Sequence, residues 1–271
     1  LIEKQETMIN LMINDQQVSV EEGTTVLAAA KKLNINIPTL CNHPDLCVAG
    51  NCRVCVVEMK GARTLIAACS MPVSDNMEIH TNTLKVRNAR KHIVELLLSE
   101  HRADCTKCYK NQNCELQTLA NEFAFGDHVF LDLTIDKKYN IDRSSPSFIK
   151  DDSKCIRCQR CVRTCAELQY ISAIGVANKG AHQKISSFHD RPMSHVVCTN
   201  CGQCVNRCAT GALTEKTYID QVWDAIYDPE KHVVVQTAPA VRVALGEDLG
   251  YDPGERVTGK MVTALRQLGF D

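Results

Sequence analysis

The stretches CIRCQRCVRTC at 155–165 and CTNCGQCVNRC at 198–208 share one cysteine pattern, with gaps of two, two and three residues. In each stretch three closely spaced thiolates can hold three corners of a cubic 4Fe-4S cluster, and the fourth, one helical turn further on, can reach a second cluster. Two complete runs therefore predict two 4Fe-4S clusters that exchange one ligand. The predicted sets are Cys155, Cys158, Cys161 and Cys208, and Cys198, Cys201, Cys204 and Cys165.

This double run is the pattern of the bacterial two-cluster ferredoxins, and we assign residues 141–220 to such a domain. Ala166 and Ala209 stand where those proteins usually carry a proline, a difference that removes no ligand. Zinc ribbons also use paired C-x2-C motifs, but two four-cysteine runs are hard to interpret in that way.

The rest of the composition also favours metal over disulfides. Sixteen cysteines in 271 residues need an explanation, but the chain is long enough for several domains and shows no secretory leader, so we expect a reducing, cytoplasmic location.

The 31 basic and 32 acidic residues nearly cancel and only 5% of residues are aromatic, which argues against nucleic-acid binding. No apolar run approaches the roughly 18 residues of a membrane span, so we expect no membrane insertion.

Residues 1–80 are expected to form a sheet with one helix. Alternating apolar residues predict strands, and a helical apolar stretch follows them. The expected elements are a hairpin over 9–13 and 18–20, a helix over 26–33 capped by Thr24, and a second hairpin over 54–59 and 64–68.

Four thiolates in this first segment can converge on a 2Fe-2S cluster, with the spacing Cys41-x10-Cys52-x2-Cys55-x13-Cys69. Cys47 offers a second possibility, because Cys47-x4-Cys52-x2-Cys55 matches the plant-type ferredoxin spacing. Spacing alone leaves the choice between Cys41 and Cys47 open.

Residues 81–140 are expected to form a small helical module. A helix over 85–99 leads to His101, and the spacing His101-x3-Cys105-x2-Cys108-x5-Cys114 brings three thiolates and one imidazole within fourteen residues. Such a set can hold either a 4Fe-4S cluster or zinc. An imidazole in place of a thiolate makes an iron-sulfur site less negative and should raise its reduction potential.

Three arginines, Arg157, Arg160 and Arg163, alternate with the cysteines of the first run. The simplest interpretation is a solvated face that offsets the charge of the cluster. The alternative is a docking patch for an acidic electron carrier.

The string TLCNHPDLCVAGNCRVCVVE at 39–58 resembles the N-terminal module of the large iron-sulfur subunit of complex I and of iron-only hydrogenases. In both families the cysteine that matches Cys41 is a ligand, so the resemblance implies Cys41, with Cys47 as a buried or reactive spare thiol. The sheet with one helix resembles the β-grasp fold of plant-type ferredoxins. Both families continue with a His-ligated 4Fe-4S module, which implies iron rather than zinc at His101.

Residues 221–271 contain no cysteine, and QTAPAVR at 236–242 with ALRQLGFD at 264–271 resembles the opening of the catalytic domain of iron-only hydrogenases. The fold expected for the whole chain is therefore α+β and multi-modular, ending in the start of an α/β catalytic domain. The last helix shows no capping signal, as if the chain were cut inside this domain. The active-site H-cluster of that family has no ligands left here and is expected only in a downstream domain.

The resemblance implies a catalytic subunit of a multi-subunit, NAD(P)- and ferredoxin-linked iron-only hydrogenase. Its one 2Fe-2S and three 4Fe-4S clusters would relay electrons between a flavin-containing, NAD(P)H-oxidising iron-sulfur subunit and the H-cluster. The other implied partners are a small 2Fe-2S subunit and ferredoxin. The alternatives are a relay subunit of a complex I-like or formate dehydrogenase complex, and a zinc-stabilised interaction module. No catalytic residue is expected within this stretch.

Overall fold

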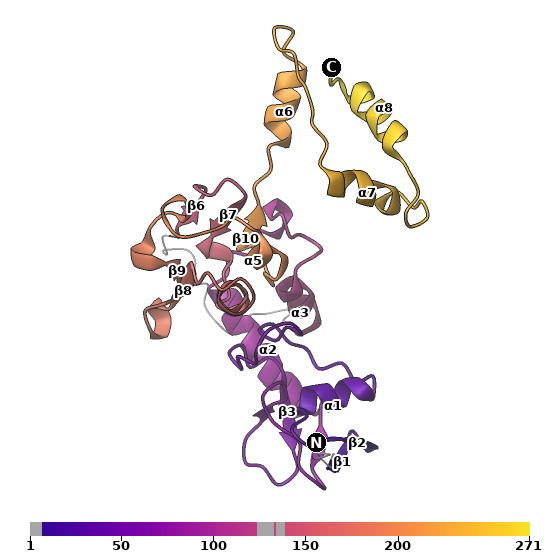
Figure 1. Ribbon diagram of the computed structural model, residues 1–271. Helices are drawn as coiled ribbons and strands as arrows, with labels where there is room; N and C mark the ends of the chain where they lie inside the picture. The colour runs from indigo at the N-terminus through magenta and orange to yellow at the C-terminus, as the bar shows by residue number, and fades with distance from the viewer. Residues whose placement is uncertain (1–6, 124–132, 134–138) are drawn as a thin grey trace, which may run out of the picture. The chain divides into compact units, whose positions relative to one another are not determined.

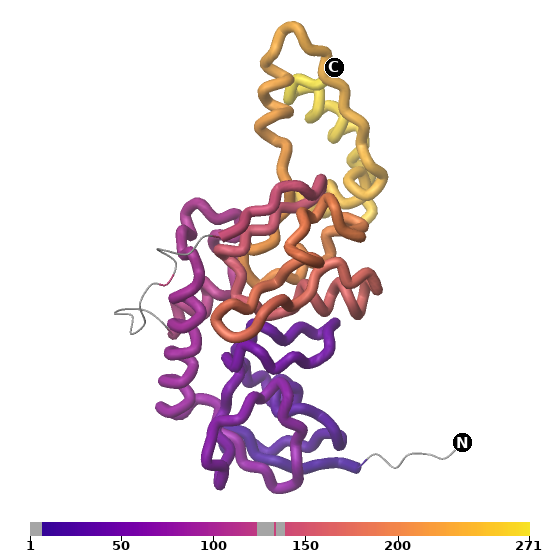
Figure 2. Tube along the Cα trace, turned by 90° about the vertical axis from the view of Figure 1, so that its left-hand side faces the viewer, coloured from indigo at the N-terminus to yellow at the C-terminus, as the bar shows by residue number. Residues whose placement is uncertain are grey.

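The computed structural model describes residues 7–123, 133 and 139–271. They form two compact units, Leu1–Lys216 and Thr217–Asp271, which we describe separately (Figure 1). In the first unit, strands β1–β3 and helix α1 lie at one end, and helix α2 leads away from them along one side (Figure 2).

The first unit begins with a five-stranded sheet in the order β2-β1-β5-β3-β4. Neighbouring strands are antiparallel except for the parallel pair β1 and β5. Both expected hairpins are confirmed, β1 with β2 and β3 with β4. The strand bounds are β1 Met8–Ile13, β2 Gln16–Glu21, β3 Val56–Met59, β4 Ile66–Ala67 and β5 Glu78–His80.

The first hairpin forms because alternate residues face the core and its turn fits the twist of the strands. Leu11, Ile13 and Val20 are buried, whereas the residues next to them in the strands are more exposed. Asn14 and Asp15 both have positive φ, 47° and 64°, as a two-residue type I′ turn requires.

Helix α1 (Val26–Lys32) buries Val26 and two alanines against this sheet. Its N-cap is Thr25, whose hydroxyl accepts a hydrogen bond from the amide of Ala28 at 3.3 Å. The predicted cap at Thr24 is therefore wrong by one residue. Thr24 instead uses its carbonyl to accept a hydrogen bond from the amide of Val73 at 2.8 Å.

Helix α2 (Leu84–Ser99) confirms the helix expected over 85–99, with Thr83 as its N-cap. It packs against α3 (Glu115–Phe123) through Val94, Leu116 and Leu119. The same hydrophobic cluster also contains Leu40, Val54, Ile156 and Ala209, so segments from different parts of the first unit share this core, while two further clusters lie in the first sheet and in the 141–216 segment.

The 141–216 segment has short strands around two equivalent ligand turns. Positive φ occurs at matching places in the two turns, at Arg157 and Gln159 in one and at Asn200 and Gly202 in the other. The strands form the sheet β10-β7-β6 and the hairpin β8-β9. Their bounds are β6 Ile141–Asp142, β7 Phe148–Asp151, β8 Ile174–Ala177, β9 Lys184–Ser187 and β10 Leu213–Glu215.

The helices of this segment are α4 (Arg160–Arg163), the π-helical turn η3 (Thr164–Leu168) and α5 (Gln203–Asn206). Short 3₁₀-helices occur in the first unit at Cys105–Lys107, Asp152–Lys154, Gly180–His182, Phe188–Asp190 and Met193–His195.

The second unit contains α6 (Ile219–Ile226), α7 (Pro239–Asp248) and α8 (Thr258–Leu268). Contrary to expectation, α8 is capped. Gly269 adopts φ 104°, and the amides of Gly269 and Phe270 bond to the carbonyls of Arg266 and Leu265. A glycine in this conformation ends a helix because it has no Cβ to clash.

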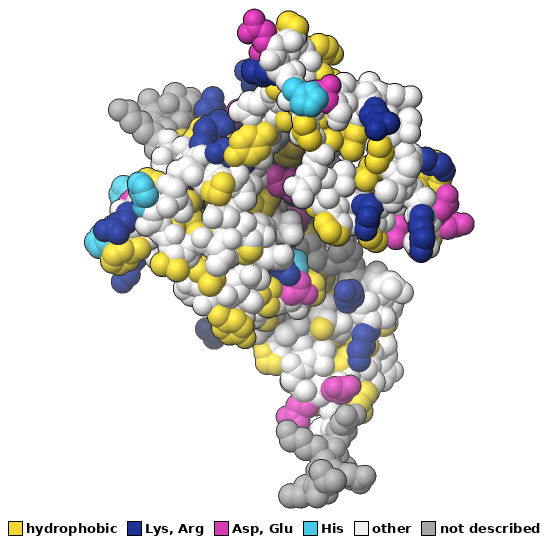
Figure 3. Space-filling view, turned by 45° about the horizontal axis from the view of Figure 1, so that its top comes forward, with side chains coloured by type: hydrophobic (Ala, Val, Ile, Leu, Met, Phe, Trp, Pro, Cys, Tyr) yellow, Lys and Arg dark blue, Asp and Glu magenta, His cyan; other side chains and the backbone are white. Residues whose placement is uncertain are grey.

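On the molecular face in Figure 3, basic and acidic side chains lie interspersed, in keeping with a net charge of −1. Among the described residues, no helix combines the length and the apolar character needed to cross a bilayer.

Candidate metal centres

The thiols of the first module lie beside the end of its sheet. Cys41, Cys55 and Cys69 are each at most 2% exposed. Hydrogen bonds from the thiols of Cys52 and Cys69 lower the pKa of Cys41 to about 2. A hydrogen bond from Cys69 lowers the pKa of Cys55 to about 7. Hydrogen bonds thus link the four thiols in the order Cys52, Cys41, Cys69 and Cys55, and such a group suits a cation that replaces the thiol protons.

Cys47 lies apart from this group. It is exposed, and its thiol donates a hydrogen bond to Glu167 Oε1 at 2.6 Å. That hydrogen bond raises the pKa of Cys47. The expectation of a buried or reactive spare thiol is therefore wrong, because the side chain is exposed and a raised pKa leaves less thiolate at neutral pH.

His101 follows the end of α2 and is 8% exposed. Burial lowers its pKa, so the neutral imidazole is favoured, and Nδ1 has no hydrogen-bond partner among the described residues. An orphaned, buried and neutral ring nitrogen is the state in which histidine binds metal. The ring shares one cavity with the three cysteines of its predicted set, Cys105, Cys108 and Cys114.

Gly211 closes this cavity on one side. A Cβ built at this position would lie 2.6 Å from Cys108 Sγ, so a side chain there would force the sulfur or the backbone to shift. Among the described residues, no three His, Cys, Asp or Glu side chains are placed to hold a single metal ion.

The first of the paired sites lines an apolar cavity. Cys155, Cys158 and Cys161 surround it together with Cys208 from the second run. Burial raises the pKa of Cys155 to about 12 and that of Cys158 to about 11, and the neighbouring thiols add to both shifts. So many buried thiols cannot ionise together unless a positive metal centre compensates them.

The second paired site collects the other four thiols. Burial raises the pKa of Cys204 to about 12, and its thiolate neighbours Cys198, Cys201 and Cys165 contribute in the same direction. The structure thus brings Cys165 to the second run and Cys208 to the first, which is the exchanged arrangement that the spacing predicts.

Backbone amides point at sulfur in both runs. The amides of Arg157 and Asn200 lie 3.4 Å from the sulfurs of Cys155 and Cys198, at equivalent places in the two turns. The amide of Ala173 lies 3.3 Å from Cys165 Sγ. Such N–H···S contacts stabilise thiolate ligands and tune a cluster's potential. The donor set and these amides fit iron-sulfur clusters, and of the eight thiols Cys201 is exposed while the others are partly buried.

Two of the three arginines of the first run are buried, so for Arg160 and Arg163 neither the solvated face nor the docking patch is correct, whereas the side chain of Arg157 stays partly exposed. Arg160 and Arg163 are only 4% and 8% exposed. Arg160 forms a two-pronged ion pair with Glu115, at 2.5 and 2.8 Å, and Arg157 pairs with Glu100.

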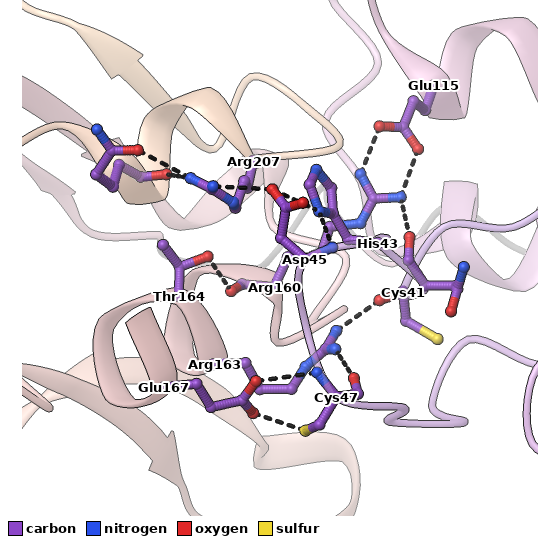
Figure 4. A network of polar contacts seen from close by, with 12 residues as sticks. Cys41, His43, Asp45, Cys47, Glu115, Arg160, Arg163, Thr164, Glu167 and Arg207 are labelled. Atoms are coloured by element: carbon purple, nitrogen blue, oxygen red, sulfur yellow. Dashed lines mark hydrogen bonds and ion pairs between the residues drawn. The ribbon is translucent and has the colours of Figure 1, made fainter. Parts of the chain in front are cut away.

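These arginines also hold the loop that begins at Cys41 (Figure 4). Arg160 donates to the carbonyl of Asn42 at 2.8 Å. Arg163 donates to the carbonyls of both Cys41 and Cys47, and Arg207 from the second run pairs with Asp45 at 3.0 Å. The sequence shows the regular spacing of Arg157, Arg160 and Arg163, but it contains no sign that Arg160 and Arg163 bind a loop more than a hundred residues away.

Four family models match the chain in order. They are a 2Fe-2S iron-sulfur cluster binding domain, an NADH-ubiquinone oxidoreductase-G iron-sulfur binding region, an NADH-quinone oxidoreductase subunit 3 ferredoxin-like domain and the C-terminal domain of the iron only hydrogenase large subunit. The matched residues are 6–84, 90–128, 145–214 and 231–271, respectively. The predicted mixed α/β organisation, with a 2Fe-2S domain followed by 4Fe-4S domains, is confirmed at this level.

Two hydrogenases match nearly the whole chain. The NADP-reducing hydrogenase subunit HndD of Solidesulfovibrio fructosivorans is 48% identical over 270 residues, covering 98% of this chain and 46% of that protein. Iron hydrogenase 1 of Clostridium pasteurianum is 37% identical over 267 residues, covering 97% and 46%. The chain therefore spans less than half the length of these relatives.

Complex I proteins match a shorter part. An NADH-quinone oxidoreductase G-type protein of Rhizobium meliloti (strain 1021) is 38% identical over 211 residues, covering 78% of this chain and 24% of that protein. A crystal structure of an NAD+-reducing [NiFe]-hydrogenase in the H2-reduced state superposes with a TM-score of 0.71 and 26% identity, covering 78% of this chain and 88% of that one. The chain belongs to the iron-sulfur protein family that iron-only hydrogenases share with complex I, and it corresponds to the N-terminal, cluster-binding portion of the hydrogenase members.

Proposed function

We propose that this chain is the electron-transfer arm of a multi-subunit iron-only hydrogenase. When bound, its clusters supply one-electron transfer between a flavin-containing NAD(P)H-oxidising subunit and a hydrogen-converting H-cluster. Fifteen cysteines are used by the four proposed sites and Cys47 lies in the first module, so these 271 residues provide no cysteine for the H-cluster. A small 2Fe-2S subunit and ferredoxin are the other proposed partners.

Each proposed cluster has its own ligand set and module. Cys41, Cys52, Cys55 and Cys69 hold the 2Fe-2S cluster in a β-grasp domain over 1–80. His101, Cys105, Cys108 and Cys114 hold a 4Fe-4S cluster in 81–140. Cys155, Cys158, Cys161 and Cys208, and Cys198, Cys201, Cys204 and Cys165, hold the ferredoxin-like pair in 141–220, and the catalytic domain begins within 221–271.

The observation that carries the relay is the exchange of the fourth cysteines between the two runs. Cys208 lines the cavity of the first run, and Cys165 lies beside Cys204 of the second. Such an exchange places two sites back to back, which serves transfer between them. The protein's own contribution is positioning, exclusion of water and amide contacts to sulfur.

A complex I-like relay is the second candidate, because the NADH-quinone oxidoreductase relatives match 78% of the chain. The match of residues 231–271 to the hydrogenase family model favours the first candidate. The sequence downstream of Asp271 distinguishes them, since hydrogenase cysteine motifs are expected only in the first.

Metal analysis tests the relay itself. One 2Fe-2S and three 4Fe-4S clusters require about fourteen iron atoms and a matching amount of acid-labile sulfide per chain. Zinc without sulfide would overturn the proposal in favour of a structural module.

A further inference from the structure

Arg163 is one of the side chains that connect the ferredoxin-like module to the first module. It lies in α4, between two cysteines of the first run, and reaches a loop more than a hundred residues earlier in the chain. One Nη donates to the carbonyl of Cys41 at 2.5 Å and the other donates to the carbonyl of Cys47. A single guanidinium thus joins both ends of the loop 41–47.

The same loop is held at further points. The carboxylate of Glu167, one turn after Arg163, accepts from the amide of Cys47 at 3.0 Å. Arg160 and Arg207 hold Asn42 and Asp45. The loop that carries Cys41 is therefore shaped by another module, and Figure 4 shows how the side chains of α4 and η3 point toward it.

Arg163 differs from Arg160 in its charge balance. Arg160 forms a salt bridge with Glu115, whereas within the described residues Arg163 makes no salt bridge and donates to neutral carbonyls. The Glu167 carboxylate accepts its hydrogen bonds from Cys47, which lower its pKa, and the charge of Arg163 contributes to the same shift. Arg163 is also buried, and its Nε has no partner among the described residues. A buried cation that is only partly compensated costs stability, so packing alone does not account for an arginine at this position.

We infer that Arg163 is a positioning residue that seats the 41–47 loop and whose charge favours the reduced form of the 2Fe-2S cluster. The inference rests on the proposed assignment of Cys41 as a cluster ligand. Reduction by one electron, supplied by a chemical reductant, adds one negative charge to the site. A buried positive charge bonded to the carbonyl of a ligand stabilises that added charge.

The test is a redox titration of the iron-loaded chain, followed by the 2Fe-2S EPR signal at temperatures where the 4Fe-4S signals are broadened. R163Q is expected to lower the ratio of reduced to oxidised 2Fe-2S cluster about fivefold at fixed poise, an effect in the range of one partly screened unit charge. R163K keeps the charge but lacks the two-pronged geometry. Its ratio should stay within about twofold of the wild type, while amide hydrogen exchange in 42–47 becomes several-fold faster.

The matched control is the double variant R160Q/E115Q, which removes the neighbouring bond to Asn42 without changing the net charge. Its ratio should also stay within about twofold of the wild type. An R163Q ratio equal to that of this control would overturn the inference. So would an R163K variant whose ratio falls as far as that of R163Q, or whose loop exchange is unchanged.

The two levels of proposal fail in different ways. A wild-type chain without any 2Fe-2S signal would overturn the proposed function, and the inference with it. A normal wild-type signal with an unshifted R163Q ratio overturns the role of Arg163 alone. If R163Q does not assemble its cluster, the loop exchange and the ratio of R163K decide the matter.

Discussion

The first module and the ferredoxin-like module gather their cysteines in opposite ways. In 155–208 six of the eight thiols come from two short turns, and matching positive φ values at Arg157 and Asn200 wrap each turn around its own site. In 41–69 the four thiols are spread over loops beside the sheet, and arginines of the other module hold the loop of Cys41. A compact motif needs mainly its own backbone, whereas a dispersed ligand set depends on tertiary contacts.

The largest effect is expected at the fourth cysteine that the two runs exchange. Cys165→Ser and Cys198→Ser should abolish the same 4Fe-4S EPR signal, with a loss of up to about four iron atoms per chain. Cys155→Ser should abolish the other signal. If Cys165→Ser and Cys155→Ser removed the same signal, each run would bind its own cluster and the exchange would be wrong.

Substituting the two candidate first ligands, Cys41 and Cys47, tests the dispersed ligand set of the first module. Cys41→Ser should eliminate the 2Fe-2S EPR signal, because Cys41 is buried among the other three thiols. Cys47→Ser is the matched control and should retain the signal, because that side chain is exposed and bonded to Glu167. The opposite outcome would exchange the roles of the two cysteines.

The His101 site combines features of the compact turns and of the dispersed set. Its three cysteines are close in sequence, but Gly211 of the ferredoxin-like module closes its cavity. Gly211→Ala places a methyl group against Cys108 Sγ and should lower the occupancy of this one cluster by at least about half. Gly175→Ala is the control, because its Cβ would meet no atom within 4 Å. Iron content and EPR measure the effect, and equal occupancy in both variants would show that the cavity tolerates the methyl group.

The smallest effect concerns the contact of Cys47 with Glu167. Because that hydrogen bond raises the pKa of Cys47, Glu167→Gln should lower the pKa and increase the thiolate fraction at mildly alkaline pH. Alkylation of Cys47 by iodoacetamide should become several-fold faster below the wild-type pKa, and the two rates should converge above it. A rate that is unchanged at every pH would mean that the carboxylate does not hold the thiol in solution.

Local elements could be predicted because their causes lie within a few residues. The β1–β2 hairpin follows from alternating side chains and a two-residue turn, and α2 follows from its apolar period. Helix ends were less predictable. The cap of α1 lies at Thr25 and the cap at Gly269 was missed, because caps depend on the φ and ψ of single residues.

The cysteine spacing alone was enough to predict four ligand groups, the exchanged pairing of the two runs and the lack of cysteines for an H-cluster, because ligand spacing is a property of the local chain. The surroundings of Arg163, Glu167 and Gly211 became visible only in the folded protein. Their partners lie about 100 or more residues away. Arginines whose spacing in the sequence is typical of a solvent-exposed face are buried in the fold, where they donate hydrogen bonds to a distant loop. No local pattern encodes such contacts, since they arise only when separate modules pack against one another.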